Sequence, residues 1–560
     1  MKKIINLLII SSFLLFGGCK KFLDINKNPN NPTGPIAEEY ILPKTIVEWA
    51  AFQPYSSSHG EDLMGYTVNP GGVSGWGTLV NYNYSPGNYR DLWSVPYDNL
   101  EDIEAVIRKS LIDPNYVVLG AAAKVLKVLH YQHLVDTYNN VPYTEANRGV
   151  GNLTPAYTNG VEIYKAIADS IDVAISEFNK GGANPSALQL TTSSDPLFKG
   201  NLTLWKKFAN TIKLRLILRA GSKVNFTNKT FSPDGFLTED ALVQPGYSNV
   251  TGKLNPTWRR TYEVSGATTS GANYASALNQ RVPSFYTVGF YDGNKIYDKF
   301  RGSLTYRVYP SPGINQLGHD PGSNDAAKVK APNDWYIATG TVNATNYASI
   351  GIFKGPSAPQ SIMLAAESYF LQAEGIVRGI ITGNAKEAFN NGILQSFRYL
   401  NKNEAGSISN KFVNVKTGKI ATAVGVKDTI AIDPLFEFNT YLTENQDNYL
   451  VNFDLATDNN KKIEAIITQK YIANNMINGI ESWNEYRRTG YPANTIPSVA
   501  NKYTSFVSLQ SLSTAPDKLP TRIQYPQEEF IYNSTNVNAQ KGSGANGGIS
   551  VFIDKIFWAK

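Results

Sequence analysis

Apolar residues recur every three or four positions along several stretches of the chain, which is the spacing of one buried face of an α-helix. One such stripe carries Leu100, Ile103 and Ile107, and Asp98 with Glu101 forms a capping-box pattern that predicts where this helix begins. The predicted helices occupy about residues 98–111, 122–133, 161–178, 202–221, 362–379 and 384–400. Tryptophans that fall within helical patterns are expected in the core, namely Trp49, Trp205 and Trp483. The chain is therefore expected to be mainly helical.

The last two predicted helices form the clearest pair. Gly379 fits the C-terminal stop of the first helix, and Asn384 with Glu387 caps the start of the second. Small residues stand where the two helices must approach, and the spacing of Ala385 and Phe389 is typical of tetratricopeptide-type hairpins. The sequence has no self-similar period of about 34 residues, so the helix hairpins are expected to repeat in structure without repeating in sequence.

Residues 224–360 differ in composition from the predicted helices. Gly, Asn, Ser, Thr, Pro and Tyr dominate there, and helical periodicity is absent. Short strands and long loops are expected there, inserted between helical blocks. A loop-rich region of this length inside a globular chain is usually functional. The insert is therefore expected to contribute to a binding face.

The N-terminus has the layout of an export signal. Lys2 and Lys3 precede a short apolar run over residues 4–16, which is too short to span a bilayer. Gly17 and Gly18 then lead into Cys19, as in lipoproteins whose cysteine is lipidated and becomes the mature N-terminus. The alternative is an ordinary secretory signal with a cysteine there by chance. The first interpretation predicts a protein that is exported and held to a membrane by acyl chains.

Composition narrows the function classes. Cys19 is the only cysteine, so neither a disulfide framework nor a cysteine-based metal site is expected. The formal charge is +6, and because Lys2 and Lys3 leave with the signal the mature chain carries +4. So small a charge on a chain of this length argues against nucleic-acid binding. No later apolar stretch is long enough for a transmembrane helix.

Blocks of sequence taken in order resemble the SusD/RagB family of nutrient-binding outer-membrane lipoproteins. They are CKKFLDINKNPNNPT at 19–33, AAAKVLKVLHYQHLVDTYNNVPYTEA at 121–146, ESYFLQAEGIVRG at 367–379 followed by NAKEAFNNGILQSF, QKYIANNMINGIESWNEYRRTGYPA at 469–493, and LPTRIQYPQEEFIYNSTN at 519–536. FWAK closes the chain. The blocks span nearly the whole mature chain, and the later ones most resemble the branch whose ligands are not limited to starch.

The resemblance implies an architecture. After a signal at 1–18, residues 19–560 are expected to form one SusD-like domain. Four tetratricopeptide-like helix pairs at about 36–222 and 361–490 would be the scaffold. A loop-rich, partly β insert at about 223–360 would form the ligand face, and residues 491–560 would be an irregular C-terminal segment.

The resemblance also implies a function without catalysis or cofactors. The protein would capture an oligosaccharide or peptide at the outer membrane and deliver it to a SusC-like TonB-dependent transporter, which it covers like a hinged lid. Two other classes remain open from the residues alone. One is a surface hydrolase whose carboxylates come from distant segments, and the other is an envelope scaffold or adhesin.

Flat aromatic rings beside amides, carboxylates or arginine are the groups that bind sugar rings and their hydroxyls. The stretch 75–91, GWGTLVNYNYSPGNYRD, has this mixture, and its rings are expected to face solvent because they lie among turn-forming residues outside the helical stripes. In the family, loops early in the chain and loops of the central insert contact one ligand. The candidate ligand-binding residues are Trp76, Tyr82, Tyr84, Tyr89, Phe285, Tyr286, Trp335 and Tyr336. The alternative is that these rings pack loops onto helices or contact the transporter.

Other motifs are expected to be structural. His130 and His133 lie three apart on a predicted helix, but no further ligands complete a zinc site. The G-x-G-x-x-G at 542–547 follows no strand and has no room for a βαβ unit, so it is expected to be a loop. Glu528 and Glu529 are adjacent, so their side chains diverge and do not form a glycosidase pair.

The segment ESWNEYRRTGYP concentrates charge on one helix. Glu481 and Glu485 can approach Arg488 across helical turns, with Arg487 beside it. A structural ion network is the favoured interpretation, and recognition of a ligand carboxylate is the alternative.

Overall fold

The fold is that of a computed structural model of the 560-residue chain. The structure describes residues 38–71, 76–262, 281–306, 309–310, 314–320, 350–408, 411–419 and 428–560. The predicted signal, Cys19, and the candidate ligand residues Trp335 and Tyr336 lie outside the described residues.

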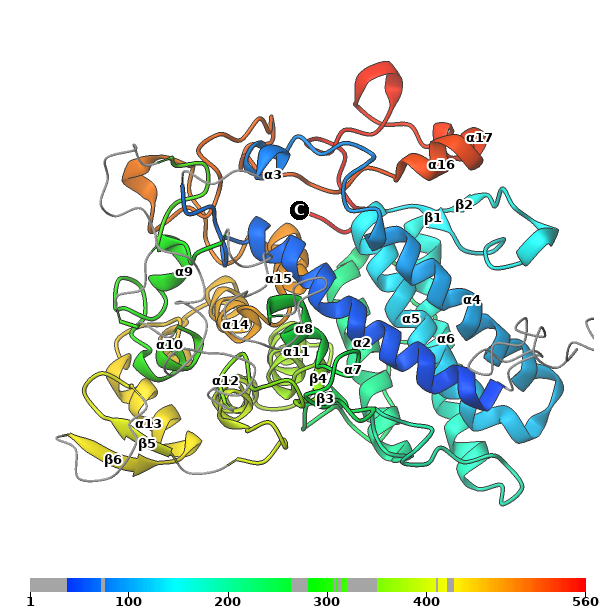
Figure 1. Ribbon diagram of the computed structural model, residues 1–560, viewed down its shortest axis with the longest axis horizontal. Coiled ribbons are helices and arrows are strands. Elements are labelled where there is room, and N and C mark those ends of the chain that lie inside the picture. Colours follow the sequence, from blue (N-terminus) through cyan, green and yellow to red (C-terminus); the bar gives the residue numbers. More distant parts are fainter. Residues whose placement is uncertain are drawn as a thin grey trace, which may run out of the picture.

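Long helices packed in pairs form the scaffold (Figure 1). The pairs are α2 (Glu38–Leu63) with α4 (Asp91–Ile112), α5 (Val117–Tyr138) with α6 (Gly160–Gly182), α11 (Ala365–Val377) with α12 (Ala385–Asn401), and α14 (Asn459–Asn474) with α15 (Gly479–Thr489). Helix α7 (Leu202–Ala220) packs on both α6 and α11, and α15 packs on α2, so the N-terminal and C-terminal pairs form one body. This arrangement confirms the predicted mainly helical fold class. Within the described ranges, none of the helices is long and apolar enough to cross a membrane.

The helix pair α11/α12 matches the sequence pattern closely. The Asn384 side chain accepts a hydrogen bond from the Glu387 amide and caps α12, as predicted. Helix α11 ends just before Gly379, which has a positive φ of 69°. Its start differs, because α11 begins at Ala365 while Ile362 lies in a strand.

Helix α4 begins earlier than predicted. It starts at Asp91, and Asp98 lies inside the helix rather than at its cap. The apolar stripe extends upstream through Leu92 and Trp93, which are buried, so tertiary packing continues the helix past the local capping signal. The predicted stripe also ends early, because Leu111 is 71% exposed at the last turn.

Three two-stranded antiparallel sheets complete the regular structure. They pair β1 (Val141–Pro142) with β2 (Tyr157–Thr158), β3 (Ala241–Val243) with β4 (Gln360–Met363), and β5 (Lys411–Asn414) with β6 (Thr429–Ile432). The β3–β4 pair joins the two ends of the central region, so residues 244–359 leave and rejoin the scaffold at one place.

The central region also contains short helices, where strands and loops alone were expected. These are α8 (Pro256–Tyr262), α9 (Phe285–Val288) and α10 (Lys299–Thr305). Side-chain caps explain two of them, because Ser284 accepts from the Thr287 amide and Asp298 from the Arg301 amide. The division of the mature chain into scaffold, insert and C-terminal segment stays a prediction.

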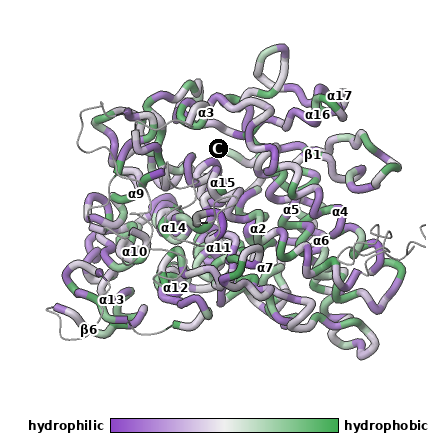
Figure 2. The backbone as a smooth tube through the Cα atoms, in the orientation of Figure 1, coloured by the Kyte–Doolittle hydropathy of each residue, from purple (hydrophilic) through white to green (hydrophobic). Residues whose placement is uncertain are grey.

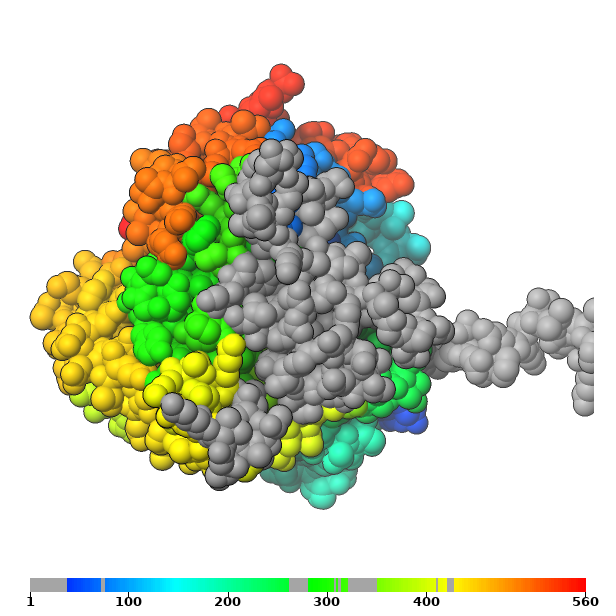
Figure 3. All heavy atoms as spheres, turned by 60° about the vertical axis from the view of Figure 1, so that its left-hand side comes forward, coloured from blue at the N-terminus to red at the C-terminus, as the bar shows by residue number. Residues whose placement is uncertain are grey.

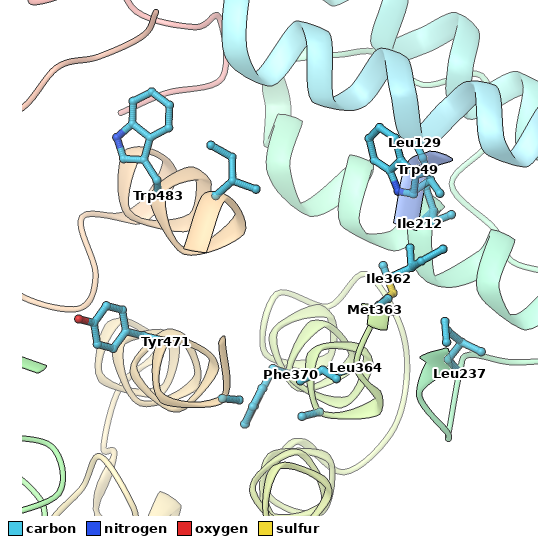
Figure 4. Close-up of a cluster of buried hydrophobic side chains, with 14 of the residues drawn as sticks. Trp49, Leu129, Ile212, Leu237, Ile362, Met363, Leu364, Phe370, Tyr471 and Trp483 are labelled. Atoms are coloured by element: carbon cyan, nitrogen blue, oxygen red, sulfur yellow. The ribbon is translucent and has the colours of Figure 1, made fainter. Parts of the chain in front are cut away.

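The core runs between the helix pairs. The scaffold helices carry both hydrophobic and hydrophilic residues (Figure 2), and the buried apolar ones meet in one large cluster, part of which is shown in Figure 4. Trp49, Trp205 and Trp483 are all buried, as predicted. Asp195 accepts a hydrogen bond of 2.9 Å from the Trp205 indole, which satisfies that buried N–H group.

A network of buried ion pairs crosses this core and links α5, α7, α14 and α15. Arg219 pairs with Asp136 and Glu481, and its guanidinium lies 3.3 Å from Glu485. Lys470 lies 3.0 Å from Glu481 and 3.4 Å from Glu485. Burial by itself raises the pKa of the Glu485 carboxyl, but the surrounding cations outweigh it and hold that pKa well below its ordinary value.

The ion network predicted for α15 is therefore confirmed, with one change in its pairing. Arg488 pairs with Glu485, as expected. It also donates two hydrogen bonds, of 2.6 and 2.7 Å, to the Glu374 carboxylate of α11. Glu481 turns instead toward Arg219 of α7. The difference arises because long-range packing supplies partners that lie far away in sequence.

Candidate functional site

Three segments far apart in sequence meet on one side of the molecule. They are residues 76–91, 281–288 and 494–510, and we call the surface they share the loop face (Figure 3). The Ser508 amide donates to the Tyr82 hydroxyl at 3.0 Å, which joins the first and third segments. Val282 pairs with Val68, just after α2, which brings in the second segment. The loop face thus combines an early loop, the central insert and the C-terminal segment.

Tight turns shape the first segment. Tyr82 and Tyr89 have positive φ values of 60° and 58°, which bulky residues rarely adopt. Between them the Asn88 side chain accepts hydrogen bonds from the Ser85 amide and hydroxyl, which fixes the intervening turn. Such backbone strain persists only where the surrounding packing holds it.

The expectation that the rings of this segment face solvent is wrong for Trp76, Tyr82 and Tyr84. Their exposed fractions are 5%, 1% and 6%. The Tyr84 ring packs edge-on against Tyr89 with centroids 5.3 Å apart, and both rings contact His59 near the end of α2. These tyrosines therefore anchor the turns to the scaffold, and burial raises the pKa of the Tyr82 and Tyr84 hydroxyls.

Trp76 makes a separate contact, with the guanidinium of Arg281 over its ring. Trp76 stands just before the short helix α3 (Gly77–Asn81), is 5% exposed, and is covered by the Arg281 guanidinium at 5.0 Å from its ring. Arg281 also forms hydrogen bonds of 2.8 and 2.9 Å with the Asp62 carboxylate. Tyr89 is partly buried. The guanidinium therefore lies over the indole while two of its N–H groups are engaged by the Asp62 carboxylate, and the three groups hold one another in place.

The two candidates on α9 have opposite environments. Tyr286 is fully buried, because its hydroxyl donates to the Ala493 carbonyl at 2.7 Å and the Lys295 ammonium lies over its ring. It therefore fixes the insert to the C-terminal segment, contrary to the expected exposure. Phe285 is partly exposed, and its ring packs edge-on against Tyr503 with centroids 5.4 Å apart.

Two further residues lie beside Phe285 that no sequence pattern indicated. Tyr503 and Lys502 are both partly exposed, and the Lys502 ammonium lies 4.2 Å from the centre of the Phe285 ring. Neither lies in a periodic stripe or a known motif, and only their folding against the insert places them on the loop face. Phe285 and Tyr503 together offer partly exposed aromatic surface, with the Lys502 ammonium over the Phe285 ring.

His130 and His133 are buried or partly buried in the helical scaffold and hydrogen-bonded within it, as predicted. His130 is hydrogen-bonded to Asn99 and the Leu126 carbonyl, and burial lowers its pKa to about 3. His133 is hydrogen-bonded to the Leu92 carbonyl, and burial lowers its pKa to about 4. Within the described part of the chain, no group of three or more His, Cys, Asp or Glu side chains is arranged to hold a metal ion.

The adjacent carboxylates of α16 (Gln527–Tyr532) are each engaged by a different partner. Glu528 pairs with Arg90 of the loop face, and Glu529 accepts from the Tyr157 hydroxyl at 2.7 Å. Glu528 therefore ties α16 to the loop face, and Glu529 ties it to β2. The glycine-rich tail forms a single 3₁₀ turn at Ala545–Gly547, in line with the predicted loop.

A hollow of about 600 Å³ lies beside the β3–β4 pair, away from the loop face. Its lining residues are Leu242, Gln244, Ser357, Pro359, Asn403, Glu404, Ala405 and Gly406, none of which is aromatic. It lacks the flat rings that a sugar-binding surface requires, so the loop face is the better candidate.

Two family matches cover most of the chain. Residues 29–232 match the family described as "Starch-binding associating with outer membrane". Residues 330–559 match the family described as "Susd and RagB outer membrane lipoprotein". Among curated proteins, no sequence shows significant similarity to the chain.

Solved structures share the fold over almost the full length. A SusD homolog from Bacteroides fragilis NCTC 9343 is 16% identical, with a TM-score of 0.66 over 93% of this chain and 100% of its own. A SusD-like protein from Bacteroides thetaiotaomicron VPI-5482 is 21% identical, with a TM-score of 0.63 over 93% and 99%. A chitin-binding SusD homolog from Flavobacterium johnsoniae is 20% identical, with a TM-score of 0.59 over 92% and 98%.

Proposed function

Because the chain belongs to the SusD/RagB family of nutrient-binding outer-membrane lipoproteins, we propose that it captures oligosaccharides at the cell surface and delivers them to a SusC-like TonB-dependent transporter. Proteins of this family bind without catalysis, which removes the surface-hydrolase alternative. The observation that carries the proposal is the convergence of three distant segments on the loop face, with partly exposed aromatic rings on it.

The loop face has the chemistry that sugar binding requires. Phe285 and Tyr503 supply accessible ring surface for the apolar faces of sugar rings. Lys502 supplies a hydrogen-bond donor over the Phe285 ring. The contact of Arg281 with the buried Trp76 ring joins the first two segments of the loop face. In this proposal Tyr82, Tyr84 and Tyr286 hold the face in shape.

The ligand class is tested with a panel of soluble oligosaccharides. Chito-oligosaccharides come first, because one structural relative is described as chitin-binding, and malto-oligosaccharides follow from the name of the first family match. Short peptides form the third group. We expect at least one glycan series to bind in calorimetry, and binding of peptides alone would contradict the choice of oligosaccharide.

Phe285→Ala should weaken binding of the best oligosaccharide about ten-fold, because loss of one stacking ring costs on the order of 1–2 kcal/mol. The matched control is its neighbour Tyr286→Ala, which removes a buried ring and should lower the melting temperature. Calorimetry and thermal melts on both variants separate the two roles. Normal binding by Phe285→Ala, with its folding intact, would remove this ring from the site.

Cross-linking in intact envelopes should recover a TonB-dependent barrel as the main partner. A lipoprotein that binds nutrients at the outer membrane needs a transporter to move them inward. Mass spectrometry of the cross-linked material identifies the partner. Recovery of peptidoglycan or cell-wall proteins alone would instead favour an envelope scaffold or adhesin.

Cys19→Ala should remain unprocessed or be released from the outer-membrane fraction. Stable attachment requires acyl chains on the mature N-terminus, and Cys19 is the only cysteine that could carry them. Fractionation and mass spectrometry of the N-terminal peptide test this. A wild-type protein cut elsewhere and found free in solution would disprove lipidation at Cys19.

A further inference from the structure

A cavity of about 60 Å³ lies where α2, α5, α7, β4 and α15 meet, away from the loop face. Its polar lining includes Gln53 on α2, Gln132 and Asp136 on α5, Arg219 on α7 and Glu481 on α15. Its apolar lining includes Trp49, Leu129 and Ile362, which lie close together beside α5 (Figure 4). The cavity thus has polar groups from four helices around one small space.

Three buried polar atoms on these lining residues lack hydrogen-bond partners. They are Gln53 Oε1, Gln132 Nε2 and Arg219 Nε. The other polar atoms of Gln132 and Arg219 have partners. The Gln132 side-chain oxygen accepts two hydrogen bonds from Arg215, and the terminal nitrogens of Arg219 pair with Asp136 and Glu481. Gln132 Nε2 approaches the Tyr164 hydroxyl, but not with the geometry of a hydrogen bond. Buried donors and acceptors are almost always paired in folded proteins, so these atoms point to a ligand.

The charges around the cavity balance. Arg215 pairs with Glu367 at 3.1 Å, while Arg219 pairs with Asp136 and Glu481. Every charged lining residue therefore has an opposite charge in contact. An added ion would be buried without compensation, which is costly. A neutral ligand fits this environment better.

We propose that the cavity is a binding site for a small cluster of ordered water molecules that bridges Gln53, Gln132 and Arg219. Water both donates and accepts, so it can satisfy the two unpaired donors and the one unpaired acceptor together. A single water needs roughly 10–15 Å³ of such space and two to four polar partners, so about 60 Å³ accommodates several. The cluster completes the polar network between the N-terminal and C-terminal helix pairs.

High-resolution crystallography of the detergent-solubilised mature protein tests the proposal. We expect ordered waters within about 3.2 Å of Gln53 Oε1, Gln132 Nε2 and Arg219 Nε, connected to one another by hydrogen bonds. In crystals of Gln53→Met, which keeps the side-chain length but removes the acceptor, the water on that residue should disappear. Gln469→Met is the matched control, because Gln469 is buried outside this cavity with its amide already hydrogen-bonded, so the cluster should persist.

Xenon distinguishes a hydrated cavity from an apolar one. Crystals pressurised with xenon should show no xenon peak in the cavity, because this gas occupies dry apolar cavities. A xenon peak, a bound ion or organic molecule, or side chains that collapse to fill the space would each overturn the proposal. Loss of the cluster in Gln469→Met would also contradict it, since that side chain does not line the cavity.

Discussion

Arg219→Met should lower the free energy of unfolding by about 3–5 kcal/mol, because it leaves the buried Asp136 carboxylate without its ion-pair partner and takes one of the cations away from Glu481 and Glu485. The Arg219 side chain is 1% exposed and contacts Asp136, Glu481 and Glu485 on two other helices. Methionine keeps most of the aliphatic volume, so the loss reports mainly on charge. Denaturant unfolding of wild type and variant at pH 7.5 measures the difference.

The matched control is Arg378→Met. Arg378 also pairs with a buried carboxylate, Glu374, but its own side chain is 38% exposed, and Glu374 keeps its contacts with Arg488. Solvent screens such a pair, so we expect a loss of less than about 1 kcal/mol. Equal losses in the two variants, or a loss below about 1 kcal/mol for Arg219→Met, would show that the network does not hold the helix pairs together.

Local signals in the sequence predicted the helical scaffold well. The cap at Asn384 depends on a hydrogen bond to a residue three positions away, so the sequence contains all of its parts. The start of α4 depends instead on burial of Leu92 and Trp93 against the rest of the fold, and the local pattern at Asp98 was misleading. Periodicity identified α4, α5, α6, α7, α11 and α12, while the ends of these helices depended on tertiary packing.

The candidate site was harder to predict, because its contacts join residues hundreds of positions apart. Tyr82 is buried by the segment around Ser508, and Tyr286 by the segment around Ala493. Turn-forming neighbours correctly indicated a turn at Tyr82, while Tyr286 lies on the short helix α9 that they did not indicate. They carry no information about what packs over either segment. Tyr503 and Lys502 gave no signal for the same reason, because only folding brings them to Phe285.

His59 connects this packing to the pH dependence of stability. Its ring is buried among Tyr84, Tyr89 and Trp483, and neither ring nitrogen has a hydrogen-bond partner among the described residues. Burial, with the nearby charge of Arg487, lowers its pKa from an ordinary value of 6.5 to about 3. Between these values the unfolded chain binds a proton that the folded protein excludes, so the contribution of His59 to stability falls as pH drops below about 6.5.

His59→Leu should therefore gain about 2 kcal/mol of stability relative to wild type when the pH is lowered from 7.5 to 5.0. The unfolded histidine becomes protonated over roughly 1.5 pH units of this interval, and each unit corresponds to about 1.4 kcal/mol. Any packing cost of leucine is independent of pH and cancels in the comparison. Denaturant unfolding of both proteins at the two pH values measures the gain.

The comparison between pH 7.5 and 8.5 is the control. His59 is neutral there in the folded and in the unfolded chain, so the difference in stability between His59→Leu and wild type should stay constant. A constant difference down to pH 5.0 as well would mean that His59 can take up a proton in the folded protein, and that the packing of the 76–91 segment over it is open to water.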